Sequence, residues 1–219
     1  MAALAYVATR PKDAVRDVAG GPDTTNAGAA QGYLLGSPDA PVKIIEYADF
    51  ECPACAGFAI ITEPDVRSRI IETGLASMTF YDFPLTMHPN TMPASHAAAC
   101  ADEQGKFWPM HDRIFQEQTE WNAQATDSPK AFFQRYARET GLDVGRWEAC
   151  YDSRKYARRI NANLADGLRR GVNSTPSFVI GDKLYAGSLS YDELKKIVDS
   201  AARSARRPAT ASGTPATAR

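Results

Sequence analysis

The pattern of apolar and polar positions divides the chain into a β-α-β segment, a long helical segment and a β-β-α segment. Residues 42–47 form an apolar, β-branched run typical of a buried strand, and residues 76–83 alternate like a second, parallel strand. Between them we expect a helix over residues 52–71, kinked or interrupted at Pro64 because proline has no backbone N–H to donate. This order of elements predicts an α/β fold.

Helical periodicity dominates from residue 91 to residue 170, which predicts a block of helices between the two mixed segments. After this block, residues 178–180 and 183–186 are two short runs around Gly-Asp, the pattern of a β-hairpin. Ser190 and Glu193 then have the spacing of a capping box, in which each side chain bonds the backbone N–H of the other. A final helix should therefore begin there.

The two ends of the chain lack this periodicity. Residues 1–31 are rich in Pro, Gly, Asp, Thr and Ala and predict a flexible lead-in, while residues 204–219 predict a disordered tail with solvated arginines. Residues 1–10 are too short for a secretory signal peptide and lack its basic stretch. They fit either the stub of a membrane anchor that was removed or an ordinary frayed terminus.

Composition limits the kinds of partner. The 219 residues are enough for one or two domains with a substantial core. A net charge of −1 gives no electrostatic attraction for nucleic acid or for an anionic membrane, so we expect neither as the main partner. The sequence contains no apolar run of about 18 residues, so nothing in it should span a bilayer.

Cys52-Pro53-Ala54-Cys55 stands where the first predicted strand gives way to the first predicted helix. A cysteine at a helix start faces unpaired backbone N–H groups and the positive end of the helix dipole, and both stabilise the thiolate. Pro53 fits there because its fixed φ suits the first helical position. Cys55, one turn deeper, is placed to attack a mixed disulfide formed by Cys52. The motif predicts thiol–disulfide exchange, with Cys52 as nucleophile and Cys55 as resolving thiol.

A metal site is not expected. A single CxxC can be half of a zinc site, but the sequence has no second CxxC and no paired Cys-His cluster. The three histidines, His88, His96 and His111, show no clear ligand spacing. No glycine-rich phosphate loop is present either, so we expect no cofactor.

The other two of the four cysteines are Cys100 and Cys150, both in the predicted helical block. If they are bonded, they close a loop of about 50 residues, which stabilises the fold by about 4 kcal/mol in the chain-entropy model. Such a bond persists only in an oxidising compartment. The alternative is two buried free cysteines that behave as small apolar residues. We expect the disulfide, because an even cysteine count accompanies a redox motif.

A second motif lies far along the chain, where Thr175-Pro176 precedes a short apolar strand. Proline belongs at the beginning of a strand because it cannot donate to the ladder, and a cis bond there is confined to X-Pro. Three segments together resemble the thioredoxin superfamily, in particular its DsbA-type branch. They are the Thr175-Pro176 segment, Cys52 to Cys55, and the stretch Glu-Gln-Gly-Lys-Phe-Trp at 103–108. The resemblance covers about residues 33–203.

The resemblance implies a thioredoxin fold with an inserted all-helical domain. The thioredoxin-like domain would comprise residues 32–88 and 171–203, and the inserted domain residues 89–170. In this family a cis-Pro loop lies against the CxxC pair. Thr175 and Pro176 should therefore line the substrate groove, where free backbone groups hold an extended peptide by strand addition. The alternative for this pair is a purely structural turn.

Two further residues take their meaning from the resemblance. Glu46 is charged within an apolar strand, six residues before Cys52, where the family holds a buried acid beneath the disulfide. It would relay a proton to or from Cys55; the alternative is that Glu46 simply points out from one face of the strand. Ala54, which with Pro53 should face the substrate, departs from the enteric enzyme, which has His there. Without the imidazole, the Cys52 thiolate loses one stabiliser, and a weaker oxidant is expected.

The function implied is that of an extracytoplasmic thiol–disulfide oxidoreductase, most simply a dithiol oxidase in the periplasm or at the outer face of the cell envelope. Its partners would be reduced or unfolded proteins and a quinone-linked membrane reoxidase of the DsbB or vitamin K epoxide reductase type. One alternative is an isomerase or reductase on the same scaffold, usually a dimer with an added dimerisation domain for which we expect no room. Another is a redox-inert binding or chaperone module. We expect a monomer.

Overall fold

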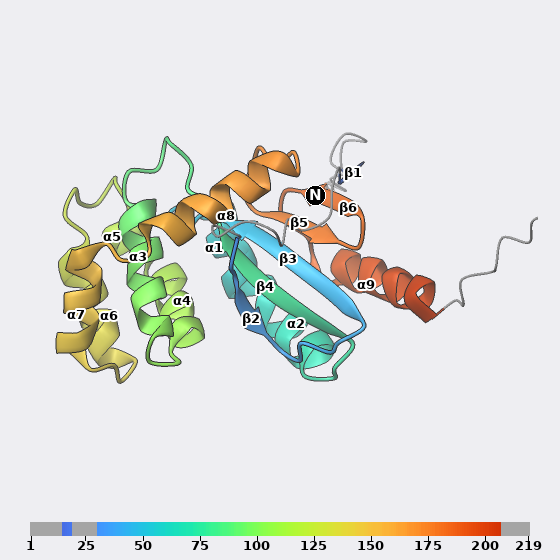
Figure 1. The fold of residues 1–219 in the computed structure, drawn as a ribbon, viewed down its shortest axis with the longest axis horizontal. Coiled ribbons are helices and arrows are strands. Elements are labelled where there is room, and N and C mark those ends of the chain that lie inside the picture. Colours follow the sequence, from blue (N-terminus) through green and yellow to red (C-terminus); the bar gives the residue numbers. More distant parts are fainter. Residues whose placement is uncertain (1–14, 19–29, 207–219) are drawn as a thin grey trace, which may run out of the picture.

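Two neighbouring strands, β3 (Val42–Ala48) and β4 (Ala76–Asp82), pair in parallel within the sheet, which confirms the prediction from their apolar patterns. The computed structural model describes residues 15–18 and 30–206. In that part of the chain the sheet has six strands in the order β1-β6-β5-β3-β4-β2 (Figure 1). The remaining pairs are antiparallel and involve β1 (Val15–Asp17), β2 (Tyr33–Leu35), β5 (Ser177–Ile180) and β6 (Lys183–Ala186).

The helical run that follows β3 is continuous from Pro53 to Ile71 but changes its pitch. It consists of α1 (Pro53–Gly57), a π-helical turn η2 (Phe58–Thr62), α2 (Glu63–Val66) and a second π-helical turn η3 (Arg67–Ile71). The interruption expected at Pro64 therefore takes the form of a π-helical turn that ends just before α2, where proline has no N–H for the regular ladder.

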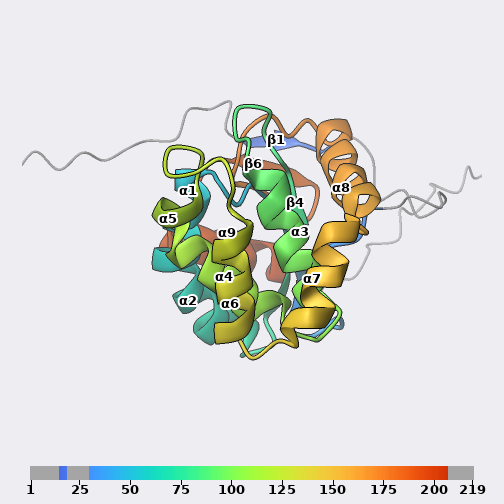
Figure 2. The same ribbon diagram turned by 90° about the vertical axis from the view of Figure 1, so that its left-hand side faces the viewer.

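Helices fill the chain between β4 and β5, as predicted. They are α3 (Thr91–Asp102), α4 (Phe107–Gln116), α5 (Gln118–Trp121), α6 (Lys130–Glu139), α7 (Val144–Ser153) and α8 (Ala157–Arg169). Figure 2 shows α3 at the centre of this group, where it packs against α4, α6 and α7. The Cys100–Cys150 disulfide joins α3 to α7.

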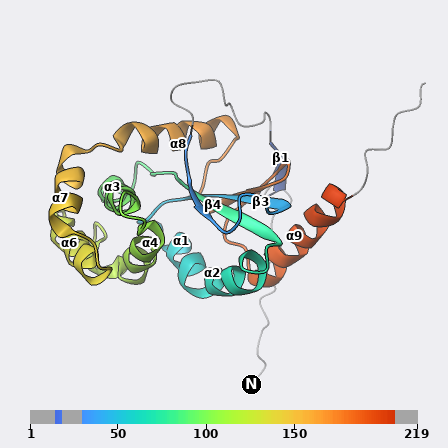
Figure 3. The same cartoon turned by 60° about the horizontal axis from the view of Figure 1, so that its bottom comes forward.

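The two faces of the sheet are covered by different helices. α1, α2 and the C-terminal helix α9 (Tyr191–Arg206) lie below the sheet in Figure 3, and α8 lies above it. The side chains of β3 alternate between these two faces: Ile44 packs toward α2 and α9, and Tyr47 packs toward the α8 side. The predicted capping box opens α9: the hydroxyl and backbone N–H of Ser190 both bond Glu193 Oε2, at 2.7 and 2.9 Å.

Both predicted flexible ends need correction. Residues 15–17, placed in the lead-in, form β1 against β6, with Asp17 paired to Lys183 at 2.7 Å. The strand is exposed along its length and is held by edge pairing, so its sequence carries no apolar pattern. Residues 204–206, placed in the tail, continue α9, because alanine-rich sequence favours helix.

The other parts of these predictions, including the leader or anchor interpretation of residues 1–10, lie outside the described residues. Within the described part, no helix is both long and apolar enough to cross a membrane. The domain boundaries at residues 88–89 and 170–171 stay predictions, although the helices between β4 and β5 coincide with the proposed insertion.

Candidate active site

Cys52 and Cys55 lie at the junction of β3 and α1, and both are free thiols in this structure. Cys52 is the N-cap of α1 in an extended conformation, and Pro53 occupies the first turn, as predicted. The backbone N–H groups of Cys55 and Ala56 both donate to the Cys52 carbonyl oxygen at 3.1 Å. Cys52 is 7% exposed, whereas Cys55 is completely buried. Only the first sulfur is therefore open to a partner.

The surroundings of Cys52 stabilise its thiolate. A hydrogen bond from the Cys55 thiol is the main cause that lowers the pKa of Cys52 to about 6, assisted by Thr175 and by the backbone N–H groups of Cys55 and Ala54. Partial burial opposes this shift. With that pKa, about nine-tenths of Cys52 is ionised at pH 7.

Cys55 has the opposite environment. Burial raises its pKa well above the ordinary value, and the hydrogen bond and charge of Cys52 and the charge of Glu46 act in the same direction. The reduced pair is therefore one thiolate and one thiol at neutral pH. This asymmetry matches the nucleophile and resolving roles predicted for the two sulfurs.

Thr175 and Pro176 lie against Cys52, although they come from the far end of the chain. The Cys52 Sγ lies 3.5 Å from the Thr175 carbonyl oxygen, and the peptide bond before Pro176 is cis. The Pro176 carbonyl is already bonded by the Gly187 N–H at 2.8 Å. The buried Thr175 hydroxyl has no hydrogen-bond partner among the described residues, so it can turn toward the Cys52 thiolate.

Glu46 is buried beneath the pair, with 2% of its surface exposed, between Phe80 of β4 and Phe178 of β5. The Glu46 carboxyl group therefore lies inside the fold, and its role as a proton relay stays a prediction. Burial is the main cause that raises the pKa of Glu46 well above its usual value; the charge of Glu63 adds to this and Arg67 opposes it. In contrast, Pro53 and Ala54 are exposed beside Cys52, where a substrate would approach.

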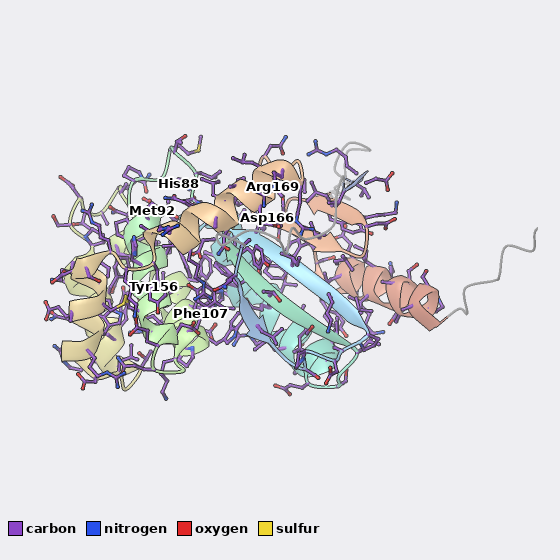
Figure 4. The ribbon with its side chains drawn as sticks, viewed as in Figure 1. His88, Met92, Phe107, Tyr156, Asp166 and Arg169 are labelled. Atoms are coloured by element: carbon purple, nitrogen blue, oxygen red, sulfur yellow. A yellow bond between two sulfur atoms is a disulfide. The ribbon has the colours of Figure 1, made fainter. Side chains whose placement is uncertain are left out.

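Two acids beside the motif were missed by the sequence analysis. Asp49 accepts hydrogen bonds from the Leu85 N–H at 2.8 Å and contacts His88 Nδ1 at 2.9 Å, on the loop before α3 (Figure 4). Glu51 accepts from the backbone N–H groups of Asn90 and Ala123. These carboxylates fasten the loop that carries Cys52 to two other loops. The signal in the sequence was a pair of acids in a short loop, where side chains commonly bond the backbone.

A second polar group lies farther along the helical run, where α2 and η3 meet α4. Glu63, His111 and Asp112 offer ligand atoms within 4.8 Å of one another. Arg67 bonds both carboxylates, with Nη2 at 2.6 Å from Glu63 Oε1 and 2.6 Å from Asp112 Oδ1. Because a guanidinium already balances these charges, we do not assign a metal to the group. The group could not be recognised from the sequence because its members come from separate helices.

Comparisons with known proteins agree with this geometry. Residues 29–200 match the family described as thioredoxin. The Na(+)/H(+) antiporter NhaA 3 of Salinispora tropica is 34% identical over 175 residues, 80% of this chain and 25% of the antiporter. The chain thus spans about a quarter of the length of the curated antiporters that it matches. The Probable disulfide bond formation protein D of Bacillus anthracis is 25% identical over 166 residues, 75% of this chain and 76% of that protein.

Solved structures share the fold. The crystal structure of α-DsbA1 from Wolbachia pipientis has a TM-score of 0.71 at 23% identity, covering 80% of this chain and 92% of that chain. Oxidised BdbD from Bacillus subtilis has a TM-score of 0.71 at 20% identity, covering 85% of this chain and 98% of that chain. The chain belongs to the thioredoxin family and has the DsbA-like fold, a thioredoxin fold with an inserted helical domain.

Proposed function

We propose that the protein is an extracytoplasmic thiol–disulfide oxidoreductase that introduces disulfide bonds into reduced protein substrates. The observation that carries this proposal is the opposed setting of the two free thiols. Cys52 caps α1 beside Thr175 and is partly exposed, with a pKa lowered to about 6, whereas Cys55 is completely buried, with a raised pKa. A stable Cys52 thiolate favours the reduced enzyme, and an enzyme with a favoured reduced state takes electrons from its substrates.

The reaction begins with the oxidised Cys52–Cys55 pair. A substrate thiolate attacks Cys52 Sγ, the Cys52–Cys55 bond breaks, and Cys55 leaves with the electron pair and takes up a proton. We assign Glu46 as the donor of this proton, because it is buried beneath the pair and burial raises its pKa, so its carboxyl group keeps its proton to a higher pH than usual. A second substrate thiolate attacks the substrate sulfur of the mixed disulfide and releases Cys52 as thiolate. The substrate loses two electrons, which the reduced pair retains.

The substrate would lie across the exposed side of Cys52. Pro53 and Ala54 border it on one side, and the Thr175 backbone borders it on the other. Because the Pro176 carbonyl is used by Gly187, an extended peptide would pair with Thr175. Because Cys52 Sγ lies 3.5 Å from this same Thr175 carbonyl, a peptide paired with Thr175 would be held beside the sulfur that its thiolate attacks.

The compartment and the electron acceptor follow from this chemistry. The Cys100–Cys150 bond favours an oxidising location, such as the periplasm or the exterior of the cell envelope. Continued turnover needs an acceptor, for which we propose a quinone-linked membrane protein of the DsbB or vitamin K epoxide reductase type. The relative from Bacillus anthracis, named for disulfide bond formation, supports the oxidase direction.

The test mixes oxidised enzyme with reduced, unfolded ribonuclease A and follows substrate thiols by acid quench, alkylation and mass spectrometry. We expect one enzyme to remove two substrate thiols and Cys52→Ser to remove none. Cys55→Ser, mixed instead with scrambled ribonuclease, should be trapped as a mixed disulfide, because its Cys52 thiolate attacks a substrate disulfide and releases one substrate thiolate. A wild-type enzyme that leaves reduced ribonuclease unchanged but reshuffles scrambled ribonuclease would instead be an isomerase.

A second candidate function is a domain that serves a membrane transporter. The match to a quarter of an Na(+)/H(+) antiporter favours it, because there the related segment belongs to a transport protein. Such a redox-inert module would bind its membrane partner without redox turnover. Its signature is binding that persists in the Cys52→Ser, Cys55→Ser variant, together with a wild-type protein that removes no thiols from reduced ribonuclease.

A further inference from the structure

Three buried titratable side chains on one side of the sheet each have an atom without a hydrogen-bond partner among the described residues. The atoms are Glu46 Oε2 on β3, Glu63 Oε2 on α2 and His111 Nε2 on α4. Buried polar atoms are nearly always paired, because an unpaired one costs stability. Three such atoms in neighbouring elements call for a functional explanation, and a shared mobile proton is one that would satisfy them.

The free atoms of Glu63 and His111 face each other, with 4.0 Å between Glu63 Oε2 and His111 Nε2. The second polar atom of each side chain, Glu63 Oε1 and His111 Nδ1, is held by a hydrogen-bond partner. Arg67 Nε donates to Glu63 Oε1 at 2.8 Å, and His111 Nδ1 lies 2.8 Å from Asp112 Oδ1. A shift of about 1 Å brings the free atoms to hydrogen-bond distance.

The pair is shielded from solvent, since Glu63 and His111 have side chains that are only 1% exposed. Aromatic rings surround the imidazole of His111, and one of them, Phe80, is the register partner of Glu46. His111 therefore lies over the same part of the sheet as Glu46. The rings have centroids 4.9–5.8 Å from that of His111 and belong to Phe50, Phe80, Phe107, Trp108 and Phe115.

The far end of this group opens to the surface. The Asp112 side chain is 37% exposed and that of Arg67 is 23% exposed. Both line a surface pocket of about 220 Å³ between the α1–α2 run and α4, together with Pro64 and Gln116. Water in this pocket can exchange protons with Asp112, whose Oδ1 contacts His111.

The near end reaches the redox pair. After burial, the charge of Glu63 is the next cause that raises the pKa of Glu46, so the two carboxyl groups are electrostatically coupled. Glu46 in turn helps to raise the pKa of Cys55. The coupled groups thus come from five elements: Cys55 of α1, Glu46 of β3, Glu63 of α2, Arg67 of η3, and His111 and Asp112 of α4.

We propose that Glu63 and His111 pass protons between Glu46 and the pocket at Asp112, so that Glu46 is recharged after each exchange at Cys55. This inference rests on the proposed function. When the disulfide opens, the Cys55 thiolate takes a proton from the Glu46 carboxyl group. The resulting carboxylate regains a proton through Glu63 and His111, and pocket water replaces it at Asp112. Reoxidation reverses the direction. No electrons move along this path, and both residues act through Glu46.

The test isolates the step that depends on Cys55. Reduced enzyme reacts with glutathione disulfide in two steps: Cys52 forms a mixed disulfide with glutathione, and Cys55 then loses its proton and displaces glutathione. Acid quench and mass spectrometry separate the two steps. For Glu63→Gln and for His111→Gln we expect an unchanged first step and a second step at least tenfold slower at pH 7, the scale of acid–base assistance.

The matched control is Asp82→Asn, which neutralises another completely buried carboxylate of the same sheet, one that is bonded to Asn163 of α8. Its second step should keep the wild-type rate. When two groups act in series on one proton path, the effects of their substitutions on the rate do not add. Glu46→Gln combined with Glu63→Gln should therefore be no slower than Glu46→Gln alone.

The wild-type pH profile provides a check that needs no variant. If protons follow an internal path, the rate of the second step should rise much less than tenfold per pH unit between pH 6 and 9. A tenfold rise per unit, which means that the Cys55 proton equilibrates with solvent and that no internal base takes it, overturns the path.

The path is also overturned if folded Glu63→Gln or His111→Gln carries out the second step at the wild-type rate. It is overturned as well if Asp82→Asn slows the second step as much as they do. If one of Glu63→Gln and His111→Gln fails to fold, the other variant decides. If wild-type enzyme does not react with glutathione disulfide at all, the proposed function fails instead.

Discussion

Cys52 Sγ lies 3.5 Å from the carbonyl oxygen of Thr175, across 123 residues of sequence. This contact joins the start of α1 to the loop before β5, so the reactive sulfur is held by both halves of the thioredoxin-like domain. The helical insertion between them does not interrupt the site. It adds Gln118 of α5, whose side-chain amide donates to the Cys52 carbonyl at 3.1 Å.

Alkylation should distinguish the two sulfurs. Because the pKa of Cys52 is about 6 and that of the buried Cys55 is raised, iodoacetamide should label Cys52 alone at mildly acidic pH. The labelling rate should follow a titration with its midpoint near pH 6. Peptide mapping by mass spectrometry measures both. Equal labelling of Cys52 and Cys55 would contradict the assigned roles.

The same ionisation makes the stability of the reduced protein depend on pH. The folded pKa of Cys52 lies below that of a thiol in the unfolded chain, so its stabilising effect is complete above the unfolded pKa and is lost as pH falls toward 6. We therefore expect reduced wild type to gain about 1 kcal/mol per pH unit over Cys52→Ser between pH 6 and 8. Urea unfolding of both proteins measures the difference; a constant difference contradicts the low pKa.

The Thr175 hydroxyl should contribute to that pKa. Thr175→Val keeps the shape of the side chain and removes a donor to the thiolate, so the pKa of Cys52 should rise. The potential should fall by about 30 mV per pKa unit. Thiolate absorbance in the ultraviolet reports the first change. Thr91→Val is the control, since Thr91 is also buried with a hydroxyl that has no partner within the described chain. A similar pKa shift in both variants would show that the effect is not local.

The Cys100–Cys150 bond should stabilise the helical insertion and leave the chemistry largely intact. The double variant Cys100→Ala, Cys150→Ala should lose about 2–5 kcal/mol of unfolding free energy, with a lower melting temperature. Thiol removal from reduced ribonuclease should continue at most of the wild-type rate, because the bond lies between α3 and α7, away from Cys52. An unchanged melting temperature, or loss of exchange in a folded variant, would contradict this division of roles.

The sequence was sufficient for the elements whose signals are local. The apolar runs of β3 and β4, the turn of the β5–β6 hairpin and the capping box at Ser190 each specify their structure within about ten residues. The resemblance then placed the Thr175–Pro176 pair beside Cys52, which no local signal could do.

What could not be predicted depends on contacts between distant segments. β1 is recognisable only by its pairing with β6, since its own side chains are exposed. The group formed by Glu63 and His111 arises because α2 and α4 pack together, and each residue alone looks like an ordinary helix residue. Glu46 was recognisable as a charge in an apolar strand, but its burial depends on both neighbouring strands and on the helices below.

The central claim is that the Cys52 thiolate makes this protein an oxidant, and the reduction potential of Cys52–Cys55 in glutathione buffers tests it most directly. We expect a potential above the roughly −270 mV of thioredoxin and, because Ala54 supplies no imidazole, below the roughly −120 mV of DsbA. Ala54→His should raise it. A potential at or below that of thioredoxin would make the protein a reductase and contradict the account.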